Sequence, residues 1–369
     1  MMDPAFAQAR LGEESASCVV MDVTNGDIIA AVSSPSFDPN LFVRGISSTN
    51  FRYLMDHDHR PMANKSVQGA YPPGSTFKMV TALAALEEGM ITPETTFRCP
   101  GYLESGGRKF HCWRHGGHGT VDLERSLSES CDVYYYEVAL KVGIDKIAEM
   151  GRRLGLGMRH DLPMSAIAEG NMPDKAWKME RHKAEWRIGD TVNASIGQGD
   201  TAITPLQLAM AYAAIANGGT VYQPQVAKAI LSSRGEVVQQ FDPVVRAEVP
   251  APEGTFEFLR TALAGVTAEG TGRIPFEGFP LDEIPVASKT GSAQVFSDNS
   301  TTAWYASFAP ADDPQYAVVI MVTRGGTGSL TITGRPLRMM PAFSKPMLSR
   351  SLPKMAVWSM SMLVITAQS

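Results

Sequence analysis

The chain has 369 residues, enough for one large domain or two of ordinary size, and therefore enough for a substantial hydrophobic core. Apolar residues make up 44% and charged residues 19% of the chain, which excludes a disordered protein and a coiled coil. The formal net charge of −5 gives no general attraction to nucleic acid or anionic lipid. No apolar run reaches the roughly 18 residues needed to cross a bilayer, so the sequence predicts a soluble globular chain.

Two β-branched runs near the start of the chain flank Asn25-Gly26. Residues 18–33 therefore predict a β-hairpin with a type I′ turn, because both central residues of that turn need φ > 0. The polar segment 34–67 predicts loops and short turns. After a Pro-Pro-Gly stop, a helix is predicted over residues 75–88, and the glycine that follows ends it.

The middle of the chain is predicted to be mostly helical. One helical stretch covers residues 123–142 and is interrupted near Cys131. A later helix begins at Thr204, which is followed by a proline in the first turn and a glutamine at the capping-box position, and it ends at Asn217.

Strands are predicted again near the end of the chain, at residues 284–295, 302–309 and 315–323. Strands at both ends with helices between them predict an α+β fold. Its single antiparallel sheet would be closed by segments that lie far apart in the sequence.

Three short patterns with chemical potential occur in order: Ser75-x-x-Lys78, Ser130-x-Asp132 and Lys289-Thr-Gly291. The first two are common by chance, and a second Ser-x-x-Lys pattern occurs at residues 351–354. Lys-Thr-Gly is rarer and is expected in about one of ten chains of this length. The three patterns together, in this order, indicate a serine-based catalytic site.

The Ser-x-x-Lys spacing has a physical interpretation. Positions i and i+3 share one face of a helix, so the Lys78 amine can reach the Ser75 hydroxyl. A lysine acts as a base only if burial or a nearby positive charge lowers its pKa, and Lys289 is a candidate for that charge. At the start of a helix, free backbone N–H groups also stabilise a developing oxyanion. The alternative is an ordinary capped surface helix with a solvated lysine.

These motifs resemble the active-site motifs of the penicillin-binding transpeptidases. Residues 71–78 (YPPGSTFK), 112–119 (CWRHGGHG), 196–199 (IGQG) and 287–293 (ASKTGSA) are similar to the elongation-type, class B enzymes of the penicillin-binding protein 2 family. The resemblance covers residues 10–329. It implies the penicillin-binding transpeptidase fold, which is also that of the serine β-lactamases. That fold has a five-stranded antiparallel sheet between helices and a mostly helical subdomain, here about residues 70–280, inserted between the sheet strands.

The resemblance also implies an activity. Ser75 would attack the penultimate D-Ala carbonyl of a peptidoglycan stem peptide, and an amine of a neighbouring stem would resolve the acyl-enzyme. Lys78 would be the base and Ser130 the proton shuttle, while Lys289 would hold Ser130. Asp132 stands where the family more usually has Asn, and it could still accept a hydrogen bond from Lys78. No cofactor is required for this chemistry, and β-lactams would acylate the same serine.

The resemblance assigns the third motif to the substrate. Thr290 would bind the terminal carboxylate, and the backbone N–H groups of Ser75 and Ser292 would form the oxyanion hole. Gly291 fits either a strand bulge or close approach of a ligand to the strand.

Three of the four cysteines, together with one histidine, give the pattern C-x12-C-x5-H-x12-C, formed by Cys99, Cys112, His118 and Cys131. Three thiolates and one imidazole are the ligand set of a structural zinc site, although this spacing matches no standard zinc finger. Penicillin-binding protein 2 relatives can carry zinc near this loop, which strengthens the prediction of structural zinc. A Cys99–Cys112 disulfide and unconnected thiols stay open, and His111 and His115 are alternative ligands.

Other functions on the same fold are a D,D-carboxypeptidase, a β-lactamase, and an inactive remnant or penicillin-binding sensor. A class A β-lactamase uses a Glu-x-x-x-Asn pattern between its second and third motifs to hydrolyse the acyl-enzyme. That pattern is absent between Asp132 and Lys289, which argues against a β-lactamase.

The resemblance places full-length relatives at the cytoplasmic (inner) membrane with the catalytic domain in the periplasm, where a polymerising glycosyltransferase of the elongation machinery would be the partner. Relatives begin with a membrane anchor and a non-catalytic domain, and we expect this chain to lack the anchor. We expect no nucleic-acid partner.

The composition changes at residue 330. Residues 330–369 carry five basic and no acidic residues, so the preceding 329 residues carry a net charge of −10. This segment does not resemble the C-terminal helix with which the family covers its sheet. We therefore expect a transpeptidase domain over residues 1–329, followed by an atypical basic tail produced by a frameshift or a chimeric end.

Overall fold

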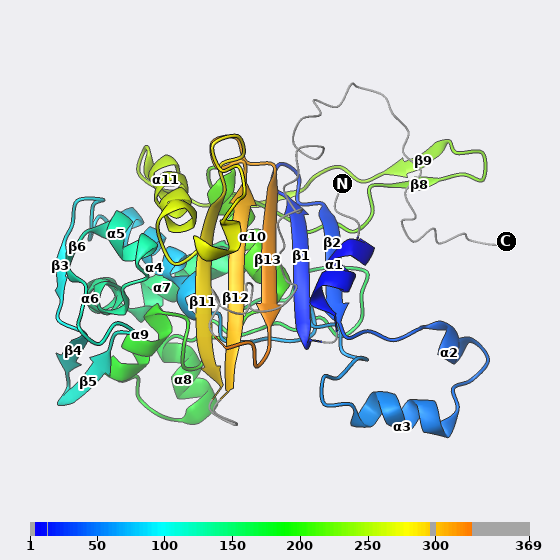
Figure 1. Cartoon of the computed structure of the whole chain (residues 1–369), viewed down its shortest axis with the longest axis horizontal. Helices are drawn as coiled ribbons and strands as arrows, with labels where there is room; N and C mark the ends of the chain where they lie inside the picture. Colours follow the sequence, from blue (N-terminus) through cyan, green and yellow to red (C-terminus); the bar gives the residue numbers. More distant parts are fainter. Residues whose placement is uncertain (1–3, 13, 296–299, 327–369) are drawn as a thin grey trace.

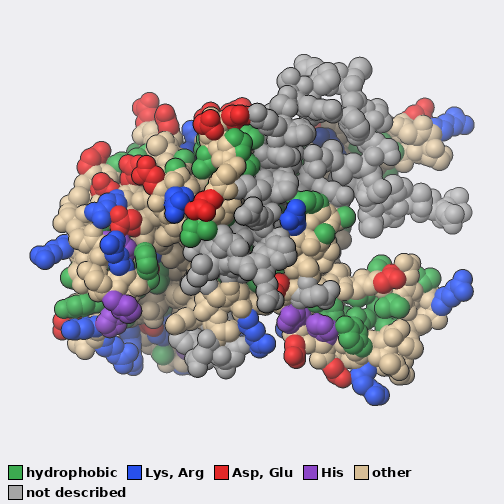
Figure 2. All heavy atoms as spheres, in the orientation of Figure 1, with side chains coloured by type: hydrophobic (Ala, Val, Ile, Leu, Met, Phe, Trp, Pro, Cys, Tyr) green, Lys and Arg blue, Asp and Glu red, His purple; other side chains and the backbone are tan. Residues whose placement is uncertain are grey.

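A computed structural model describes residues 4–12, 14–295 and 300–326 of the chain (Figure 1). The predicted basic tail, residues 330–369, lies outside the described residues. Among the described residues, no helix combines the length and the apolar character needed to cross a membrane. Acidic and basic side chains are interspersed over the helical part of the face seen in Figure 2.

One five-stranded antiparallel sheet organises the fold, with the strand order β11-β12-β13-β1-β2. Its strands are β1 (Ala16–Asp22), β2 (Ile28–Ser34), β11 (Ala287–Val295), β12 (Ser300–Ala309) and β13 (Tyr316–Val322). Strands from the two ends of the described chain pair directly, because β1 lies between β13 and β2. The predicted α+β fold with a sheet closed by distant segments is confirmed.

Alternating side chains of the sheet point to opposite faces and belong to two separate hydrophobic clusters. Val19 and Val319 belong to the larger cluster, which the sheet shares with most of the helices, whereas their neighbours Val20 and Val318 belong to a smaller cluster on the opposite face. Helix α10 (Pro205–Ala216) contacts β1 and β13 on the side of the larger cluster, and helix α1 (Pro4–Leu11) contacts β2 on the other side. The period of two expected of a strand buried on both faces is therefore met.

The helices are α1 (Pro4–Leu11), α2 (Asn40–Val43), α3 (Ser48–Asp56), α4 (Lys78–Glu87), α5 (Leu123–Ser128), α6 (Asp132–Val142), α7 (Ile144–Arg153), α8 (Lys175–His182), α9 (Ile188–Ser195), α10 (Pro205–Ala216) and α11 (Thr255–Ala268), with 3-10 turns η1 (Gly74–Phe77) and η2 (Ile274–Phe276). Most of them cover one face of the sheet and extend beyond its β11 edge, whereas α1 packs against β2 on the other face, and α2 and α3 lie beyond the β2 edge (Figure 1).

Four short two-stranded sheets lie outside the central sheet in the described part of the chain. The pairs are β3 (Phe97–Cys99) with β6 (Gly119–Val121), β4 (Tyr102–Ser105) with β5 (Arg108–His111), β7 (Thr220–Tyr222) with β10 (Val245–Glu248), and β8 (Ala229–Leu231) with β9 (Val237–Gln240).

The structure differs from the predicted elements at three places. The β1–β2 hairpin forms, but only Gly26 has positive φ (82°), and the turn is closed by the Gly26 N–H donating to the Asp22 carbonyl, so the type I′ turn was wrong. Residues 34–67 contain two short helices, and the Ser47 hydroxyl caps α3 by accepting from the Asn50 N–H.

The third difference affects the helix predicted from Ser75. Its first turn is the 3-10 turn η1, and the α-helix starts at Lys78. The Thr76 carbonyl accepts a hydrogen bond from the Tyr212 hydroxyl at 3.0 Å, and the Gly74 N–H donates to the Gly197 carbonyl. Contacts with the rest of the fold thus hold this turn in its tighter form.

Candidate active site and metal centre

The fold brings the three sequence motifs to one place. Ser75 lies in η1, and Lys78 is the first residue of α4. Ser130 lies in the link between α5 and α6, Asp132 opens α6, and Lys289 lies on the edge strand β11. Strand β11 contacts η1 directly, so the first and third motifs face each other.

Lys78 is fully buried and donates to the second motif. Its amine lies 2.7 Å from the Ser130 carbonyl oxygen, 2.7 Å from Asp132 Oδ1 and 3.2 Å from Ser130 Oγ. The Asp132 carboxylate is the opposite charge that makes burial of this lysine tolerable. Among the described residues, no hydrogen bond joins the Lys78 amine to Ser75 Oγ, because the amine is directed at these stronger acceptors.

Ser130 is shared between two lysines. The Lys289 amine donates to Ser130 Oγ at 2.8 Å, so this hydroxyl lies between the amines of the first and third motifs. Ser130 also has a left-handed backbone with φ of 54°, which is uncommon for a residue other than glycine. Such a conformation persists where surrounding contacts determine it, and Ser130 has them on both its carbonyl and its hydroxyl.

The environment of Lys289 lowers its pKa well below the usual value for lysine. Burial is the main cause, since the side chain is fully buried, and the positive charge of Lys78 acts in the same direction. The Asp132 carboxylate opposes this shift. A lysine in this position gives up its proton more easily than a solvated one.

The approach between η1 and β11 depends on two glycines. A Cβ atom on Gly74, which has φ of +57°, would lie 2.7 Å from the Ser292 carbonyl oxygen. A Cβ atom on Gly291 would lie 2.7 Å from the Pro73 carbonyl oxygen. The chain segment next to Ser75, rather than a ligand alone, therefore explains the glycine of the third motif.

The remaining third-motif residues have neighbours that the sequence patterns did not identify. The Thr290 hydroxyl lies 2.8 Å from the Thr271 hydroxyl, and the Gln198 amide donates to the Ser292 carbonyl oxygen at 3.3 Å. Gln198 belongs to the IGQG segment, whereas Thr271 carried no local signal. Trp113 contacts both Ser130 and Asp132, and it lies in the CWRHGGHG segment.

A compact metal-ligand cluster lies beside this site. The ligand atoms of Cys99, Cys112, His118 and Cys131 are buried and all lie within 4.8 Å of one another. Cys131 is the residue between Ser130 and Asp132. All four cysteines of the chain are free thiols, so the alternative Cys99–Cys112 disulfide does not form. His111 and His115 do not belong to the cluster, and both are exposed.

The cluster geometry fits zinc. His118 Nδ1 lies 3.6 Å from Cys99 Sγ and 3.5 Å from Cys112 Sγ. With bonds of about 2.3 Å to sulfur and about 2.0 Å to nitrogen, two ligands of a tetrahedral zinc ion lie about 3.6 Å apart. The hydrogen bond between Cys112 and Cys131 lowers the pKa of the Cys112 thiol and raises that of the Cys131 thiol, so within this pair the thiolate is favoured at Cys112. The residues present therefore match a closed structural zinc site.

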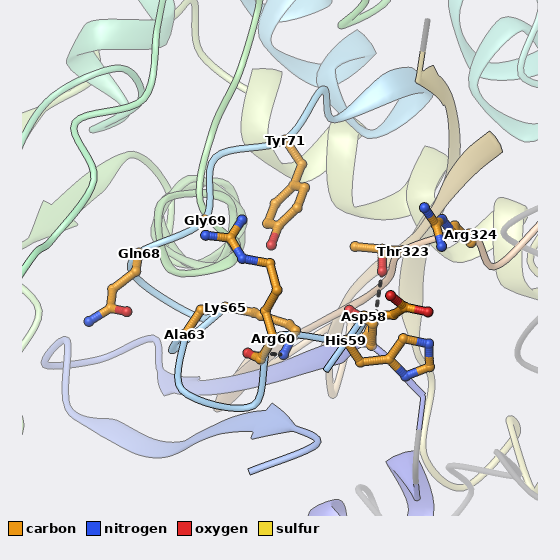
Figure 3. Close-up of a pocket in the computed structure, with 11 residues that line it drawn as sticks. Asp58, His59, Arg60, Ala63, Lys65, Gln68, Gly69, Tyr71, Thr323 and Arg324 are labelled. Atoms are coloured by element: carbon orange, nitrogen blue, oxygen red, sulfur yellow. Dashed lines mark hydrogen bonds between the residues drawn. The ribbon is translucent and has the colours of Figure 1, made fainter. Parts of the chain in front are cut away.

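A separate basic cavity of about 270 Å³ lies away from the three motifs (Figure 3). Its lining includes Asp58, Arg60, Lys65 and Tyr71, and it contains none of the predicted site residues. Lys65 is buried, and its amine reaches the Arg60 carbonyl oxygen at 3.4 Å. Burial and the Arg60 charge lower the pKa of Lys65 to about 8.

Curated proteins are similar to this chain in sequence. The peptidoglycan D,D-transpeptidase MrdA of Haemophilus influenzae is 37% identical over 331 residues, which are 84% of this chain. The chain spans about half the length of that relative, 50%.

Solved structures are similar over most of the chain. Pseudomonas aeruginosa PBP2 in complex with WCK 5153 superposes with a TM-score of 0.81 at 34% identity, over 90% of this chain and 71% of that one. A chain from a peptidoglycan synthase complex, described for its structural coordination of polymerization and crosslinking, gives a TM-score of 0.77 at 32% identity, over 93% of this chain and 59% of the other.

The family model of the penicillin binding protein transpeptidase domain matches residues 16–338, which is most of the chain. This match spans all three motifs and every strand of the central sheet. The chain therefore belongs to the penicillin-binding protein transpeptidase family.

Proposed function

We propose that this chain is the catalytic part of a peptidoglycan D,D-transpeptidase that cross-links stem peptides through an acyl-enzyme on Ser75. The observation that carries the proposal is the Ser130 hydroxyl held between two buried amines, 3.2 Å from Lys78 and 2.8 Å from Lys289. Protons can move among Lys78, Ser130 and Lys289 along these two hydrogen bonds. The family and its relatives support the same reaction class.

In the reacting form of this proposal, Lys78 is the neutral amine rather than the ammonium of the ion pair with Asp132, and it takes the proton of Ser75 Oγ. The oxygen then attacks the penultimate D-Ala carbonyl, and a C–O bond forms. As the C–N bond breaks, the departing D-Ala amine takes a proton from Ser130 Oγ, which Lys78 replaces. Lys289 keeps the Ser130 hydroxyl in position. An amine of a second stem peptide then attacks the ester by the reverse sequence, and Ser75 is regenerated.

The third motif binds the substrate in this proposal. The Thr290 hydroxyl donates a hydrogen bond to the terminal carboxylate, and Gly291 leaves the strand open to the peptide. The backbone N–H groups of Ser75 and Ser292 form the oxyanion hole, which strengthens binding as negative charge develops on the carbonyl oxygen. The contact of η1 with β11 supports this pairing of donors.

We also propose that Cys99, Cys112, His118 and Cys131 hold a structural zinc ion. The metal would supply a rigid cross-link that fixes the loop between α5 and α6. Because Cys131 lies between Ser130 and Asp132, this cross-link would hold the backbone of the second motif, including the proposed proton shuttle Ser130, in one position. The acyl transfer itself needs no cofactor.

The cellular setting follows from the relatives. We infer that the chain works at the outer face of the cytoplasmic membrane, in the periplasm, as part of a longer membrane-anchored protein. Its substrates would be stem peptides ending in D-Ala-D-Ala, and β-lactams would acylate Ser75. A polymerising glycosyltransferase would be its partner, in agreement with the similar synthase complex.

Labelling with a fluorescent penicillin tests the proposal. Wild-type protein is expected to form a stable covalent adduct, and Ser75→Ala to form none. The matched control is Ser351→Ala, which removes the serine of the second Ser-x-x-Lys pattern and should leave labelling unchanged. Steady turnover of a chromogenic cephalosporin would indicate a β-lactamase instead, and labelling that survives in Ser75→Ala would refute the assigned nucleophile.

A further inference from the structure

Trp113 is an exposed tryptophan whose two N–H groups are both used. Its side chain is among the exposed large hydrophobic side chains, at 56%. Its backbone N–H donates to Asp132 Oδ2 at 2.9 Å. Its indole N–H is shared between the carbonyl oxygens of Ser130 and Glu129, each at 3.1 Å. An exposed ring with this many fixed polar contacts is not held in place by the hydrophobic effect alone.

Trp113 and Lys78 bind the same two residues. The Lys78 amine donates to the Ser130 carbonyl oxygen and to Asp132 Oδ1, both at 2.7 Å. Trp113 donates to that same carbonyl and to the other carboxylate oxygen, Oδ2. The second motif is thus held between the base on one side and Trp113 on the other.

The same contacts join the metal-ligand cluster to the second motif. Trp113 directly follows Cys112, and its ring packs edge-on against His118 with 5.4 Å between ring centroids. On the other side of the contact, Ser130 and Asp132 flank Cys131. Trp113, Ser130 and Asp132 are therefore each adjacent in the sequence to a ligand of the cluster.

We propose that Trp113 is a positioning residue for acylation, which fixes the Ser130 peptide so that the Ser130 hydroxyl stays between Lys78 and Lys289. The inference rests on the proposed function at Ser75. Ser130 has the left-handed φ of 54°, a conformation that needs surrounding contacts to persist. If the indole N–H is lost, the Ser130 carbonyl keeps its hydrogen bond from Lys78 but loses the one from Trp113, so the peptide and the direction of Ser130 Oγ can shift.

Trp113→Phe tests this role because it keeps an aromatic ring and the backbone N–H and removes only the indole donor. The acylation rate constant of the bound penicillin is expected to fall roughly tenfold, as for loss of one hydrogen bond in the transition state. The dissociation constant of the non-covalent penicillin complex and the zinc content per chain are expected to stay unchanged. Trp186→Phe is the matched control, since it removes an indole hydrogen bond of 2.8 Å to Thr191 elsewhere.

A second variant separates the N–H group from the size of the ring. In Trp113→His the five-membered ring can place Nε2–H where the indole N–H lies, so the acylation rate should recover in part. The inference is overturned if Trp113→Phe acylates at the wild-type rate, if the Phe and His variants are equally slow, or if acylation and zinc are lost together. A wild-type chain that takes no label overturns the proposed function itself, and the inference falls with it.

Discussion

The Lys78 amine and the Asp132 carboxylate form a buried ion pair, with 2.7 Å between Nζ and Oδ1. The other carboxylate oxygen accepts the backbone N–H of Trp113 at 2.9 Å. Both oxygens therefore act as acceptors at the same time. This arrangement gives a physical reason for an aspartate at a position where the family more usually has asparagine, because an asparagine side chain has only one acceptor oxygen.

Asp132→Asn is therefore expected to damage the site, although it reproduces the common family residue. One of the two donors, from Lys78 or from Trp113, would face the amide NH2 group and lose its partner. Leaving a buried donor unpaired costs about 1–3 kcal/mol. We expect a lower free energy of unfolding in urea and acylation by penicillin slowed about tenfold.

The control for this change is Asp145→Asn, which removes the same charge from an exposed ion pair with Lys175. It should alter neither quantity, because exposed pairs contribute little to stability. Asp132→Asn protein with wild-type stability and acylation would mean that the second carboxylate oxygen does not matter.

Much of the fold was predictable because its signals are local. Apolar and β-branched runs predicted β1, β12 and β13, and the capping residues Thr204 and Gln207 predicted the start of α10, where both capping-box hydrogen bonds form. The type I′ turn was wrong because the chain closes the hairpin over a longer loop, with the Asp22 and Asn25 side chains bonding to nearby N–H groups. No local sequence pattern predicted this longer loop.

Part of the candidate site was likewise predictable from local patterns, and part was not. The three motifs and the cysteine spacing were visible as short patterns, and the structure brings those residues together. The Thr271–Thr290 and Gln198–Ser292 contacts join residues 19 and 94 positions apart, so no sequence period encodes them. The direction of the Lys78 amine toward Asp132 likewise depends on where α6 begins, which the spacing within the first motif does not contain.

Gly74→Ala is expected to impair acylation far more than its effect on stability suggests. The new Cβ atom would lie 2.7 Å from the Ser292 carbonyl oxygen, so η1 and β11 must move apart. A displacement of about 1 Å at a reacting group costs on the order of 100-fold in rate. The measurement is the second-order rate constant for labelling by fluorescent penicillin.

Gly89→Ala is the matched control for that variant. Gly89 also has a positive φ, +64°, but nothing lies within 4 Å of its added Cβ atom. It carries the same backbone strain, about 1 kcal/mol, without the clash. Equal losses of labelling rate in the two variants would mean that backbone strain causes the effect, and would refute the claim that the close approach of η1 and β11 requires Gly74.

The metal-ligand cluster is expected to bind one zinc ion per chain. X-ray absorption at the zinc edge should give three sulfur ligands and one nitrogen ligand, and removal of the metal by a strong chelator should lower the unfolding temperature. Cys131→Ser should abolish binding, whereas Cys18→Ala should leave zinc content unchanged, since Cys18 is buried in β1 outside the cluster. A folded wild-type protein that binds no zinc would refute the site.

Lys65 is expected to make stability depend on pH above about 8. Burial, with the Arg60 charge, lowers the pKa of Lys65 from 10.5 to about 8 in the folded protein. Between these two values the unfolded chain binds more protons than the folded one, so this group's contribution to the free energy of unfolding rises with pH. Below about pH 8 its destabilising effect is complete, and above about pH 10.5 it vanishes.

Lys65→Met removes this effect, so the variant should be more stable than wild type by up to about 3 kcal/mol at pH 7, with a difference that shrinks steadily toward pH 10.5. Denaturant unfolding of both proteins across this pH range gives the difference in the free energy of unfolding directly. The buried tyrosines and cysteines are common to both proteins, so their titration contributes equally to each and cancels in the difference. A difference that does not change between pH 7 and pH 10.5 would contradict the lowered pKa.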